Sequence, residues 1–425
     1  MSGGIPGSQR AQHHALKVRQ DSGAQPSMLR IGMIAGESSG DQLGAGLMRA
    51  IRARVPEAEF EGVAGAAMIA AGCRPLVHAD TLAVMGITEV LAHLPRLLRL
   101  RRRLYKHFLQ YRPDVLIGID MPDFNLGLES RLRKAGIRTV HYVSPSIWAW
   151  RARRVFKVGK AAELVLTLLP FEQPLYAQHG FHAVYVGHPL ADRAPRSLDR
   201  AALRKALHLP VDGLLVALLP GSRFTEVERL LPVFLETAQW LANHRPQLRF
   251  AMPAASPALS RHIKNQVRML VPDLPVTVIE GHAQEILGAA NAALIASGTA
   301  TLEAMLWRCP MVVAYRLSAG SYALVKGLGL LRVPHVALPN LLAGREVVPE
   351  FLQYRALPLN LGNAILRLLE DAHARDGQLQ NFAELEQGLR LGANERAAAA
   401  VLDLLQQPAA TRQARTHSRT KGAIS

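Results

Sequence analysis

The stretch ALLPGSRFTEVERLL, residues 217–231, decides the fold. Its apolar residues run to Leu219, the segment Pro220-Gly221-Ser222-Arg223 interrupts them, and a helical pattern follows at once. A strand that passes through a short turn into a helix is the building unit of a parallel α/β sheet. Thr225 and Glu228 form a capping-box pattern, which predicts that the helix begins near Thr225.

Arg223 lies just before the N-terminus of this predicted helix. Free backbone N–H groups and the positive end of the helix dipole favour an anion there. A guanidinium beside them would complete a site for a phosphate or diphosphate, with Ser222 in the same turn. On this stretch alone, a plain turn with a solvated arginine explains the pattern equally well.

Apolar runs of strand length alternate with helical patterns on both sides of this stretch. Such alternation predicts parallel sheets that are covered on both faces. The fold class is therefore α/β, with two Rossmann-like domains that face a cleft. The expected strands are 29–37, 60–65, 114–120, 138–143, 164–169 and 183–187, then 214–220, 248–254, 276–281, 292–297 and 311–315.

The expected domain boundaries follow from composition. We place an N-terminal domain at 28–190 and a C-terminal domain at 200–378, because a chain of 425 residues exceeds one comfortable core. The segment 379–407 is rich in Leu, Ala, Glu and Gln, which predicts helices. The ends, 1–27 and the basic 408–425, are polar, so we expect both to be disordered.

The charge balance indicates an anionic partner. The chain has 50 Lys and Arg against 33 Asp and Glu, a formal net charge of +17 and a pI of about 10.5. Nucleic acid, an anionic membrane surface and a phosphorylated substrate all fit this balance. Aromatic residues make up only 5% and no nucleic-acid-binding motif is recognisable, so we expect no nucleic-acid partner.

No residue pattern predicts a metal or an organic cofactor. Cys73 and Cys309 stand outside any CxxC or metal-ligand spacing, and we expect buried, reduced cysteines of an intracellular protein. Residues 1–27 lack the apolar core of a signal peptide. The longest apolar-leaning stretch is interrupted by Asn291 and by Ser297-Gly298-Thr299, so no transmembrane helix is expected.

A second strand-turn-helix stretch, ASGTATLEAM (296–305), supports the anion site. Ser297, Gly298 and Thr299 offer backbone donors and two hydroxyls in the turn. Glu303 lies one turn into the helix, where a carboxylate either binds ribose hydroxyls or only complements the helix dipole. Two such turns in one domain predict a nucleoside diphosphate, and the absence of GxxxxGK[ST] argues against ATP in a P-loop.

The turn after the first strand, AGESSGDQLG (35–44), lacks the GxGxxG of a dinucleotide site. It carries Glu37 and Ser38 instead, and a carboxylate at a strand end is expected to face the cleft. Asp41 is either a further ligand or an ordinary residue of the first helical turn.

The stretch GIDMPDFNL (118–126) places Asp120 at the end of an apolar strand and Asp123 in the next turn. Partial burial would raise the pKa of Asp120 and suit it to take a hydroxyl proton. Asp123 fits an Asx turn or a helix N-cap as well. A DxD motif for a divalent ion is absent, and Ser144 follows another strand towards the cleft.

The segment VMGITEVLAHLPRLLRLRRRLYKHF (84–108) interleaves leucines with basic residues, most densely over 94–106. A basic amphipathic helix that lies on an anionic bilayer has this pattern. An ordinary covering helix with a solvated basic face has it too, and the sequence leaves both alternatives open.

Seven blocks together resemble the lipid-A-disaccharide synthase family of bacterial inverting glycosyltransferases. They occur in order between Leu29 and Leu405, and they are AGESSGD, GIDMPDFN, HYVSPSIWAWR, GHPLAD, LLPGSR, ASGTATLEAM and HVALPNLLAGREVVPE. The resemblance implies a fold of the glycosyltransferase-B type. It also implies the condensation of UDP-2,3-diacylglucosamine with 2,3-diacylglucosamine 1-phosphate (lipid X) to the β-1,6-linked disaccharide 1-phosphate and UDP.

The resemblance implies the setting of this reaction as well. Enzymes of this family act without a metal and lie peripherally on the cytoplasmic face of the inner membrane. The domain 28–190 would then bind the acceptor and contact the membrane. The domain 200–378 would bind the UDP-sugar. The helices of 379–407 would cross back, or be exchanged within a homodimer.

The predicted site combines both lines of argument. Asp120 would deprotonate the acceptor 6-hydroxyl, with Glu37 and Asp123 as the other catalytic candidates. Arg223 and the turn amides would stabilise the leaving diphosphate, and Glu303 would hold the ribose. The predicted substrate-binding residues are Ser38, Asp41, Ser144, Ser222, Arg223, Ser297, Gly298, Thr299, Glu303, Asn340, Arg345 and Glu346.

Two other classes of function stay open at this stage. A UDP-sugar epimerase, or a glycosyltransferase with a soluble acceptor, would share the fold, although the basic leucine-rich segment argues against it. A nucleic-acid-binding protein would share the charge, and salt-sensitive binding of nucleic acid would support it.

Overall fold

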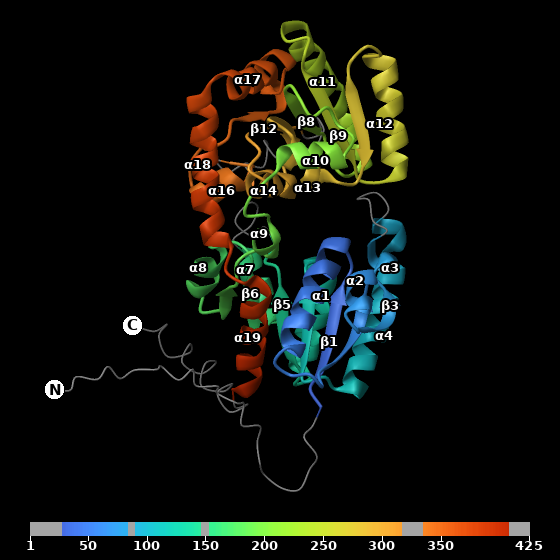
Figure 1. Cartoon of the computed structure of the whole chain (residues 1–425). Helices are drawn as coiled ribbons and strands as arrows, with labels where there is room; N and C mark the ends of the chain where they lie inside the picture. The colour runs from blue at the N-terminus through green and yellow to red at the C-terminus, as the bar shows by residue number, and fades with distance from the viewer. Residues whose placement is uncertain (1–27, 84–89, 146–152, 317–334, 408–425) are drawn as a thin grey trace, which may run out of the picture.

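The computed structural model describes residues 28–83, 90–145, 153–316 and 335–407. They form two α/β halves, one above the other in Figure 1, and each half is built around a parallel sheet. The prediction of two Rossmann-like domains is confirmed. The disorder predicted for 1–27 and 408–425 concerns residues outside the described ranges, as does part of the basic segment, 84–89.

The first half is a parallel sheet with helices on both faces. Its strands are β1 (Arg30–Ala35), β2 (Glu59–Ala64), β3 (Arg74–His78), β4 (Val115–Ile119), β5 (Arg138–Tyr142), β6 (Leu164–Thr167) and β7 (Ala183–Tyr185). The helices between them are α1 (Ser38–Arg52), α2 (Ala66–Ala70), α3 (Asp80–Ala83), α4 (Val90–Tyr111), α5 (Pro122–Lys134), α7 (Arg153–Ala161) and α8 (Glu172–Ala177). The strand order is β3-β2-β1-β4-β5-β6-β7.

The second half repeats this architecture after the short helices α9 (Pro189–Arg193) and α10 (Arg200–Ala206). Its strands are β8 (Leu215–Leu219), β9 (Arg249–Ala254), β10 (Val276–Glu280), β11 (Ala292–Ala296), β12 (Met311–Tyr315) and β13 (Glu350–Leu352), in the order β10-β9-β8-β11-β12-β13. The helices are α11 (Phe224–His244), α12 (Pro257–Leu270), α13 (Ala283–Ala289), α14 (Thr299–Leu306), α16 (Leu338–Ala343), the 3-10 turn η1 (Gln353–Arg355), α17 (Pro358–Glu370) and α18 (Ala372–Leu389).

Each sheet has one topological switch point. There the chain stops adding strands on one side of the first strand and adds the next strand on its other side. β1 pairs with both β2 and β4, and Ala35 stands opposite Ile119. β8 pairs with both β9 and β11, and Leu219 stands opposite Ile295. Open α/β sheets bind ligands outside the carboxyl ends of the strands at such points. The four turns singled out in the sequence follow these four strands.

The last helices connect the two halves. α18 lies along the second half, and the chain then crosses to the first half, where α19 (Ala393–Gln406) packs against α1 (Figure 1). Val401 and Leu404 of α19 join the apolar core around α1. Asp192 of α9 accepts hydrogen bonds from the N–H groups of Gly392 and Ala393 at 2.9 and 2.6 Å. The two segments that cross between the halves are therefore bonded to each other.

Every strand expected from the sequence is present, with ends that shift by at most two residues. The sequence analysis missed β3 and β13, the strands at one edge of each sheet. β3 contains Pro75 and is largely exposed, and β13 has three residues. Neither has the continuous apolar run that a strand buried on both faces requires.

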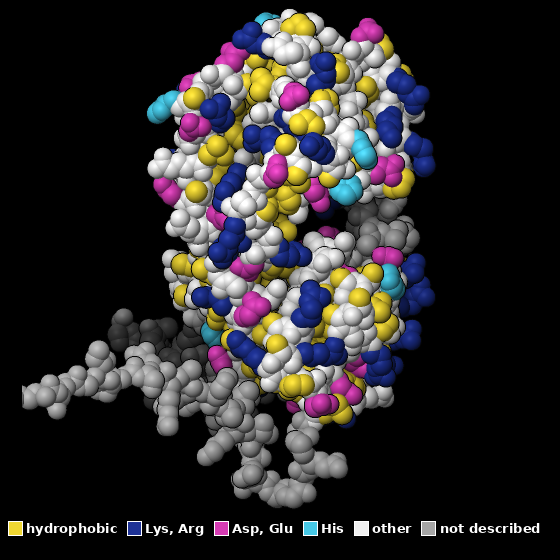
Figure 2. Space-filling model, in the orientation of Figure 1, with side chains coloured by type: hydrophobic (Ala, Val, Ile, Leu, Met, Phe, Trp, Pro, Cys, Tyr) yellow, Lys and Arg dark blue, Asp and Glu magenta, His cyan; other side chains and the backbone are white. Residues whose placement is uncertain are grey.

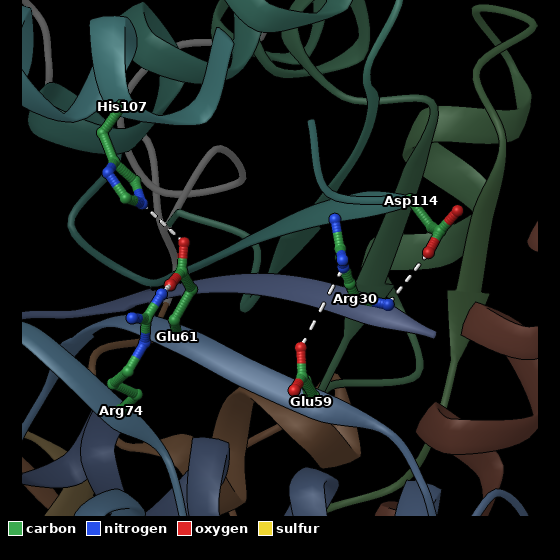
Figure 3. A network of polar contacts seen from close by, with 6 residues as sticks. All are labelled: Arg30, Glu59, Glu61, Arg74, His107 and Asp114. Carbon is green, nitrogen blue, oxygen red and sulfur yellow. Dashed lines mark hydrogen bonds and ion pairs between the residues drawn. The ribbon is translucent and has the colours of Figure 1, made fainter. Parts of the chain in front are cut away.

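A buried carboxylate ties α4 to the first sheet (Figure 3). Glu61 of β2 is 1% exposed, and its Oε1 lies 2.5 Å from His107 Nε2 of α4, while Arg74 of β3 binds the other oxygen. Leu104 and Phe108 of α4 are buried in the same interface. The carboxyl-terminal half of α4 is thus an ordinary covering helix. No helix within the described ranges is long and apolar enough to cross a membrane.

Candidate active site

The structure brings the predicted residues together in two groups, one in each half. Glu37 follows β1 and Asp120 follows β4, while Arg223 follows β8 and Ser297 follows β11. In Figure 1, β1 points towards the second half, and α13 and α14 lie on the side of the second half that is nearest to the first. Figure 2 shows the surface hollowed between the two halves, so the two groups border one cleft.

The two turns of the first half touch each other. Glu37 precedes α1, and the side chains of Glu37 and Ser38 are exposed. Gly36 fits closely against the neighbouring turn, because a Cβ at this position would lie 2.0 Å from Met121 Sδ. The acidic turn after β1 therefore lies against Met121, the residue that follows Asp120.

Asp120 is half-buried and lies in an unusual backbone conformation. Asp120 and Met121 both have left-handed φ angles, 51° and 45°. The N–H of Asp120 donates to the carbonyl of Tyr142 at 2.8 Å. The side-chain amide of Asn125 donates to the carbonyls of Asp120 at 2.8 Å and Ile119 at 3.3 Å. Such backbone strain costs roughly 1–3 kcal/mol per residue and is concentrated at functional sites.

Two acidic candidates near this turn differ in their surroundings. Asp123 is exposed in the first turn of α5 and is free to face a ligand. Asp41 is only 5% exposed, and its two oxygens accept hydrogen bonds from three backbone N–H groups, those of Gly65, Ala67 and Met68, at 2.8, 2.8 and 3.1 Å. Asp41 therefore holds the start of α2 to α1, and its place among the substrate ligands stays a prediction.

Ser144 is also held by a contact within the fold. Its side chain is 6% exposed, and its hydroxyl lies 2.9 Å from the hydroxyl of Tyr176 on α8. Burial raises the pKa of Tyr176, so this hydroxyl stays protonated at neutral pH. The pair fixes the end of β5 against α8, and the contact of Ser144 with substrate stays a prediction.

Arg223 reaches solvent at the start of α11, with its side chain 74% exposed. The predicted capping box at Thr225 and Glu228 is wrong, because the helix begins at Phe224. Glu226 reaches back instead, and its carboxylate lies 3.3 Å from the Ser222 N–H nitrogen and 3.4 Å from that of Arg223. These amides are the donors that the sequence analysis assigned to a phosphate.

The strand-turn-helix pattern predicted at 296–305 is present, with a turn between β11 and α14. Gly298 precedes α14 with a φ of 150°, a conformation that favours glycine, and Gly298 and Thr299 are exposed. The Ser297 hydroxyl donates to the carbonyl of Val336 at 2.8 Å. The Ser297 N–H donates to the carbonyl of Ala314 at 3.1 Å, so the amides that the turn offers to a ligand are those of the exposed Gly298 and Thr299. The Ser297 hydroxyl anchors the segment after residue 334.

Glu303 lies one turn further into α14. Gln284 of α13 donates its amide to Glu303 Oε1 at 2.8 Å, which orients the carboxylate. Burial raises the pKa of Glu303, and the bond from Gln284 acts against that rise. A held, partly buried carboxylate of this kind can accept hydrogen bonds from a pair of hydroxyl groups.

The predicted Asn340 lies inside a buried network. It is 0% exposed, its oxygen accepts from the N–H groups of Val347 and Val348, and its amide donates to Glu350 at 2.8 Å. These contacts use both ends of the Asn340 side chain, and its contact with substrate stays a prediction. Arg345 donates to Asn381 of α18 at 2.7 Å, and it is exposed, as is Glu346.

Two features of the described part of the chain concern metal-binding and thiol chemistry. It contains no group of three or more Asp, Glu, His or Cys side chains that could hold a metal ion. Cys73 and Cys309 are buried and not in a disulfide, as predicted, and burial raises the pKa of both thiols to about 12. At the second switch point, the Arg223 side chain and the residues Gly298 and Thr299 are exposed.

Sequence reasoning missed three residues that shape the site. Asn125 holds the Asp120 turn, Gln284 orients Glu303, and Glu226 occupies the diphosphate turn. Glu226 stands three residues after Arg223, so the capping rule could have found it if the helix start had been placed correctly. Asn125 and Gln284 lack such a local signal, since the groups they bind are brought to them by the folded chain.

Comparison with known proteins decides the family. The model of the lipid-A-disaccharide synthetase family matches residues 31–404. The chain belongs to the lipid-A-disaccharide synthase family. The lipid-A-disaccharide synthase of Pseudomonas paraeruginosa is 50% identical over 379 residues, which cover 89% of this chain and 99% of that protein. The synthase of Serratia proteamaculans is 48% identical over 376 residues, 88% of this chain and 98% of that protein.

Solved structures confirm the fold that the family resemblance implied. The UDP-GlcNAc 2-epimerase of Neisseria meningitidis bound to UDP-GlcNAc superposes with a TM-score of 0.62 at 11% identity, over 89% of this chain and 100% of that chain. The glycotransferase of kitacinnamycin gives 0.59 at 18% identity, over 89% and 99%. At these identities the likeness shows the glycosyltransferase-B fold alone. The family match therefore decides between a lipid A enzyme and an epimerase of the same fold.

Proposed function

We propose that this member of a glycosyltransferase family of lipid A biosynthesis condenses UDP-2,3-diacylglucosamine with 2,3-diacylglucosamine 1-phosphate (lipid X). One observation carries the proposal at the level of the site. A strained, half-buried carboxylate stands at the switch point of one sheet, and an arginine with two amide turns stands at the switch point of the other. A base and an acceptor of negative charge on opposite walls of a cleft suit an inverting glycosyl transfer.

In the proposed reaction Asp120 takes the proton of the acceptor 6-hydroxyl. The oxygen then forms a bond to the anomeric carbon of the donor, and the bond from that carbon to the diphosphate oxygen breaks on the opposite face. The electron pair leaves with UDP, and the proton stays on the Asp120 carboxyl. Glu37 and Asp123 are exposed beside this turn, where they would bind acceptor hydroxyls.

The second half would hold the departing nucleotide. Arg223 and the amides of Gly298 and Thr299 lie at neighbouring strand ends, where they would stabilise a diphosphate that gains negative charge. Because Glu226 occupies the Ser222 and Arg223 amides, the diphosphate must displace its carboxylate to reach them. Glu303, oriented by Gln284, would accept the ribose hydroxyls.

Membrane contact is proposed for the amino-terminal half of α4. Figure 2 shows Lys and Arg side chains gathered at the edge of the first half where α3 and α4 lie. The α4 residues that line a hollow of about 280 Å³ are Arg96, Leu97, Arg99, Leu100 and Arg103. Leu98 is 37% exposed on the same helix. Basic side chains beside exposed leucine favour an anionic lipid surface, here the cytoplasmic face of the inner membrane.

A homodimer is proposed from the family resemblance alone. In the single chain α19 packs on its own first half, and the same contacts could form between two exchanged chains. Size-exclusion chromatography with light scattering would measure the mass, and a monomer at micromolar concentration would contradict the proposal.

The reaction itself is tested with the purified protein and the two acylated glucosamines. Mass spectrometry should find the disaccharide 1-phosphate and UDP in equal amounts, and EDTA should leave the rate unchanged. Asp120→Ala should lower the rate by about 10²–10⁴-fold and leave the affinity for UDP intact. No disaccharide, or conversion of the UDP-sugar to an epimer, would refute the proposed reaction, and near-normal turnover by Asp120→Ala would remove Asp120 from the base role.

A further inference from the structure

Beneath the Asp120 turn lies a buried polar pair that the proposed mechanism does not use. Glu129 of α5 and His141 of β5 are both 0% exposed, and Glu129 Oε1 lies 2.8 Å from His141 Nδ1. Their other polar atoms, Oε2 and Nε2, have no hydrogen-bond partner among the described residues. Burial raises the pKa of Glu129, and His141 acts against that rise. Apolar residues of similar volume are often at least as stable as such a pair, so stability alone does not explain it.

The pair is linked to the turn through Asn125. Asn125 and Glu129 stand four residues apart on α5, so both side chains lie on the same face of the helix. Asn125 is 1% exposed, and its amide donates to the carbonyl of Asp120 at 2.8 Å and to that of Ile119 at 3.3 Å. Two side chains on one face of α5 therefore have separate partners. Asn125 bonds to the Asp120 turn, and Glu129 bonds to His141.

Gly118 shows how closely this face of α5 fits the sheet. Gly118 lies on β4, two residues before Asp120, and stands opposite His141 on β5. A Cβ at Gly118 would lie 2.0 Å from Glu129 Oε1 and 3.0 Å from Asn125 Cβ. The missing side chain of Gly118 leaves the space that these two side chains occupy. A change at either of them would therefore shift α5 relative to the Asp120 turn.

We propose that Asn125, supported by the buried Glu129–His141 pair, is a positioning residue that fixes the Asp120 carboxylate for catalysis. The inference rests on the proposed function of Asp120 as the base. Two successive left-handed residues persist only where their surroundings hold them, and Asn125 supplies two of the hydrogen bonds that do so. A displacement of about 1 Å at a reacting group costs on the order of 10²-fold in rate.

Asn125→Leu tests the first part of the proposal, because leucine keeps the volume and removes the donor. We expect kcat to fall by about 10²-fold. The KM for the UDP-sugar and the Kd of UDP should change by less than about threefold, since the nucleotide residues belong to the other half. A KM that rises with kcat unchanged would overturn the positioning role.

Glu129 tests the second part. Glu129→Gln keeps an acceptor for His141 and the size of the side chain, so kcat should stay within about threefold of the unchanged protein. Glu129→Leu removes the bond and should lower kcat by about tenfold or more. Equal rates for the two variants would show that the hydrogen bond between Glu129 and His141 does not support Asp120.

Thr139→Val is the matched control for loss of a buried hydrogen bond in the same half. The Thr139 hydroxyl donates to the carbonyl of Ala161 at 2.9 Å, and Thr139 is 0% exposed. This variant should lower the Tm about as much as Asn125→Leu does and leave kcat unchanged. A kcat that falls in proportion to the Tm in both variants would contradict the proposal.

A double-mutant cycle separates positioning from folding. In an Asp120→Asn background, Asn125→Leu should cost less than about threefold in the residual rate, because no base is left to position. A loss of about 10²-fold in both backgrounds would overturn the proposal. Near-normal turnover by Asp120→Asn alone would instead refute the proposed base, so the two failures are distinguishable.

Discussion

Glu226 determines the charge at the diphosphate turn when no nucleotide is bound. Its carboxylate lies 3.3 and 3.4 Å from the backbone nitrogens of Ser222 and Arg223, and 3.5 Å from the Arg223 guanidinium. An incoming diphosphate needs the same donors and carries the same sign of charge as Glu226. If UDP binds at this turn as proposed, the Glu226 carboxylate competes with its diphosphate, and displacing the carboxylate would lower the apparent affinity for UDP.

Glu226→Gln should consequently bind UDP more tightly. An exposed charge contact of this kind is worth at most about 1 kcal/mol, which corresponds to roughly fivefold in Kd. Isothermal titration calorimetry at low and high salt measures the effect, which should shrink as salt rises. Glu228→Gln removes the same charge from an exposed position of α11 and should leave the Kd unchanged. Weaker binding by Glu226→Gln would show that Glu226 supports the ligand instead.

At the residue scale, the sequence predicted strand ends better than it predicted which side chains are free to bind. Glu37, Asp120 and Arg223 were singled out because a strand end followed by a helix start is a local pattern, which the structure contains. Asp41 and Asn340 were assigned to substrate, although the fold uses their oxygens. The partners of Asp41 lie 24 to 27 residues away in the sequence, and no local pattern reveals such contacts.

At the scale of single elements, α4 combines two roles that the sequence could not separate. Its carboxyl-terminal half is docked on the sheet by His107 and by buried Leu104. Its earlier part keeps Leu98 exposed, with Arg99 and Arg102 also at the surface. The leucine pattern therefore belongs partly to the core and partly to the surface, and burial decides which. Only the exposed part is available to a membrane.

Reversing charge on this exposed part should detach the protein from anionic vesicles. Each basic residue near such a surface contributes about 1 kcal/mol, so Arg99→Glu with Arg102→Glu should weaken binding by about 10²-fold or more. Sedimentation with phosphatidylglycerol vesicles measures the binding, and phosphatidylcholine vesicles give the baseline. Arg261→Glu with Lys264→Glu makes the same change on exposed residues of α12 and should have little effect. An equal loss in both pairs would show that net charge, rather than α4, attracts the protein.

The edge strands show the limit of pattern reading at this scale. The central strands were found because they are apolar along their whole length and buried by helices on both faces. β3 and β13 have one neighbouring strand each, and their burial is partial. An edge strand requires little apolar sequence, so composition alone does not mark it.

At the scale of the whole molecule, the chain passes between the two halves twice. The two connecting segments are hydrogen-bonded to each other. The chain passes from first to second half through α9, and it returns between α18 and α19. Asp192 of α9 caps the start of α19 through the N–H groups of Gly392 and Ala393. Arg390 donates to the carbonyls of Asp192 and Ala194 at 3.2 and 3.0 Å. Movement of one half against the other must therefore bend both crossings together.

Asp192→Ala should loosen α19 from the first half without unfolding the second. Loss of a helix N-cap costs about 0.5–2 kcal/mol, so amide hydrogen exchange should speed up in α19 and in α1, which packs against it. Exchange in β9 and α12 of the second half should stay unchanged. Asp371→Ala is the matched control, because Asp371 caps α18 through the N–H of Ala374 at 3.1 Å and does not touch the crossing. If Asp371→Ala speeds exchange in α1 as much as Asp192→Ala does, the two halves are coupled through α18 rather than through the bonded crossings.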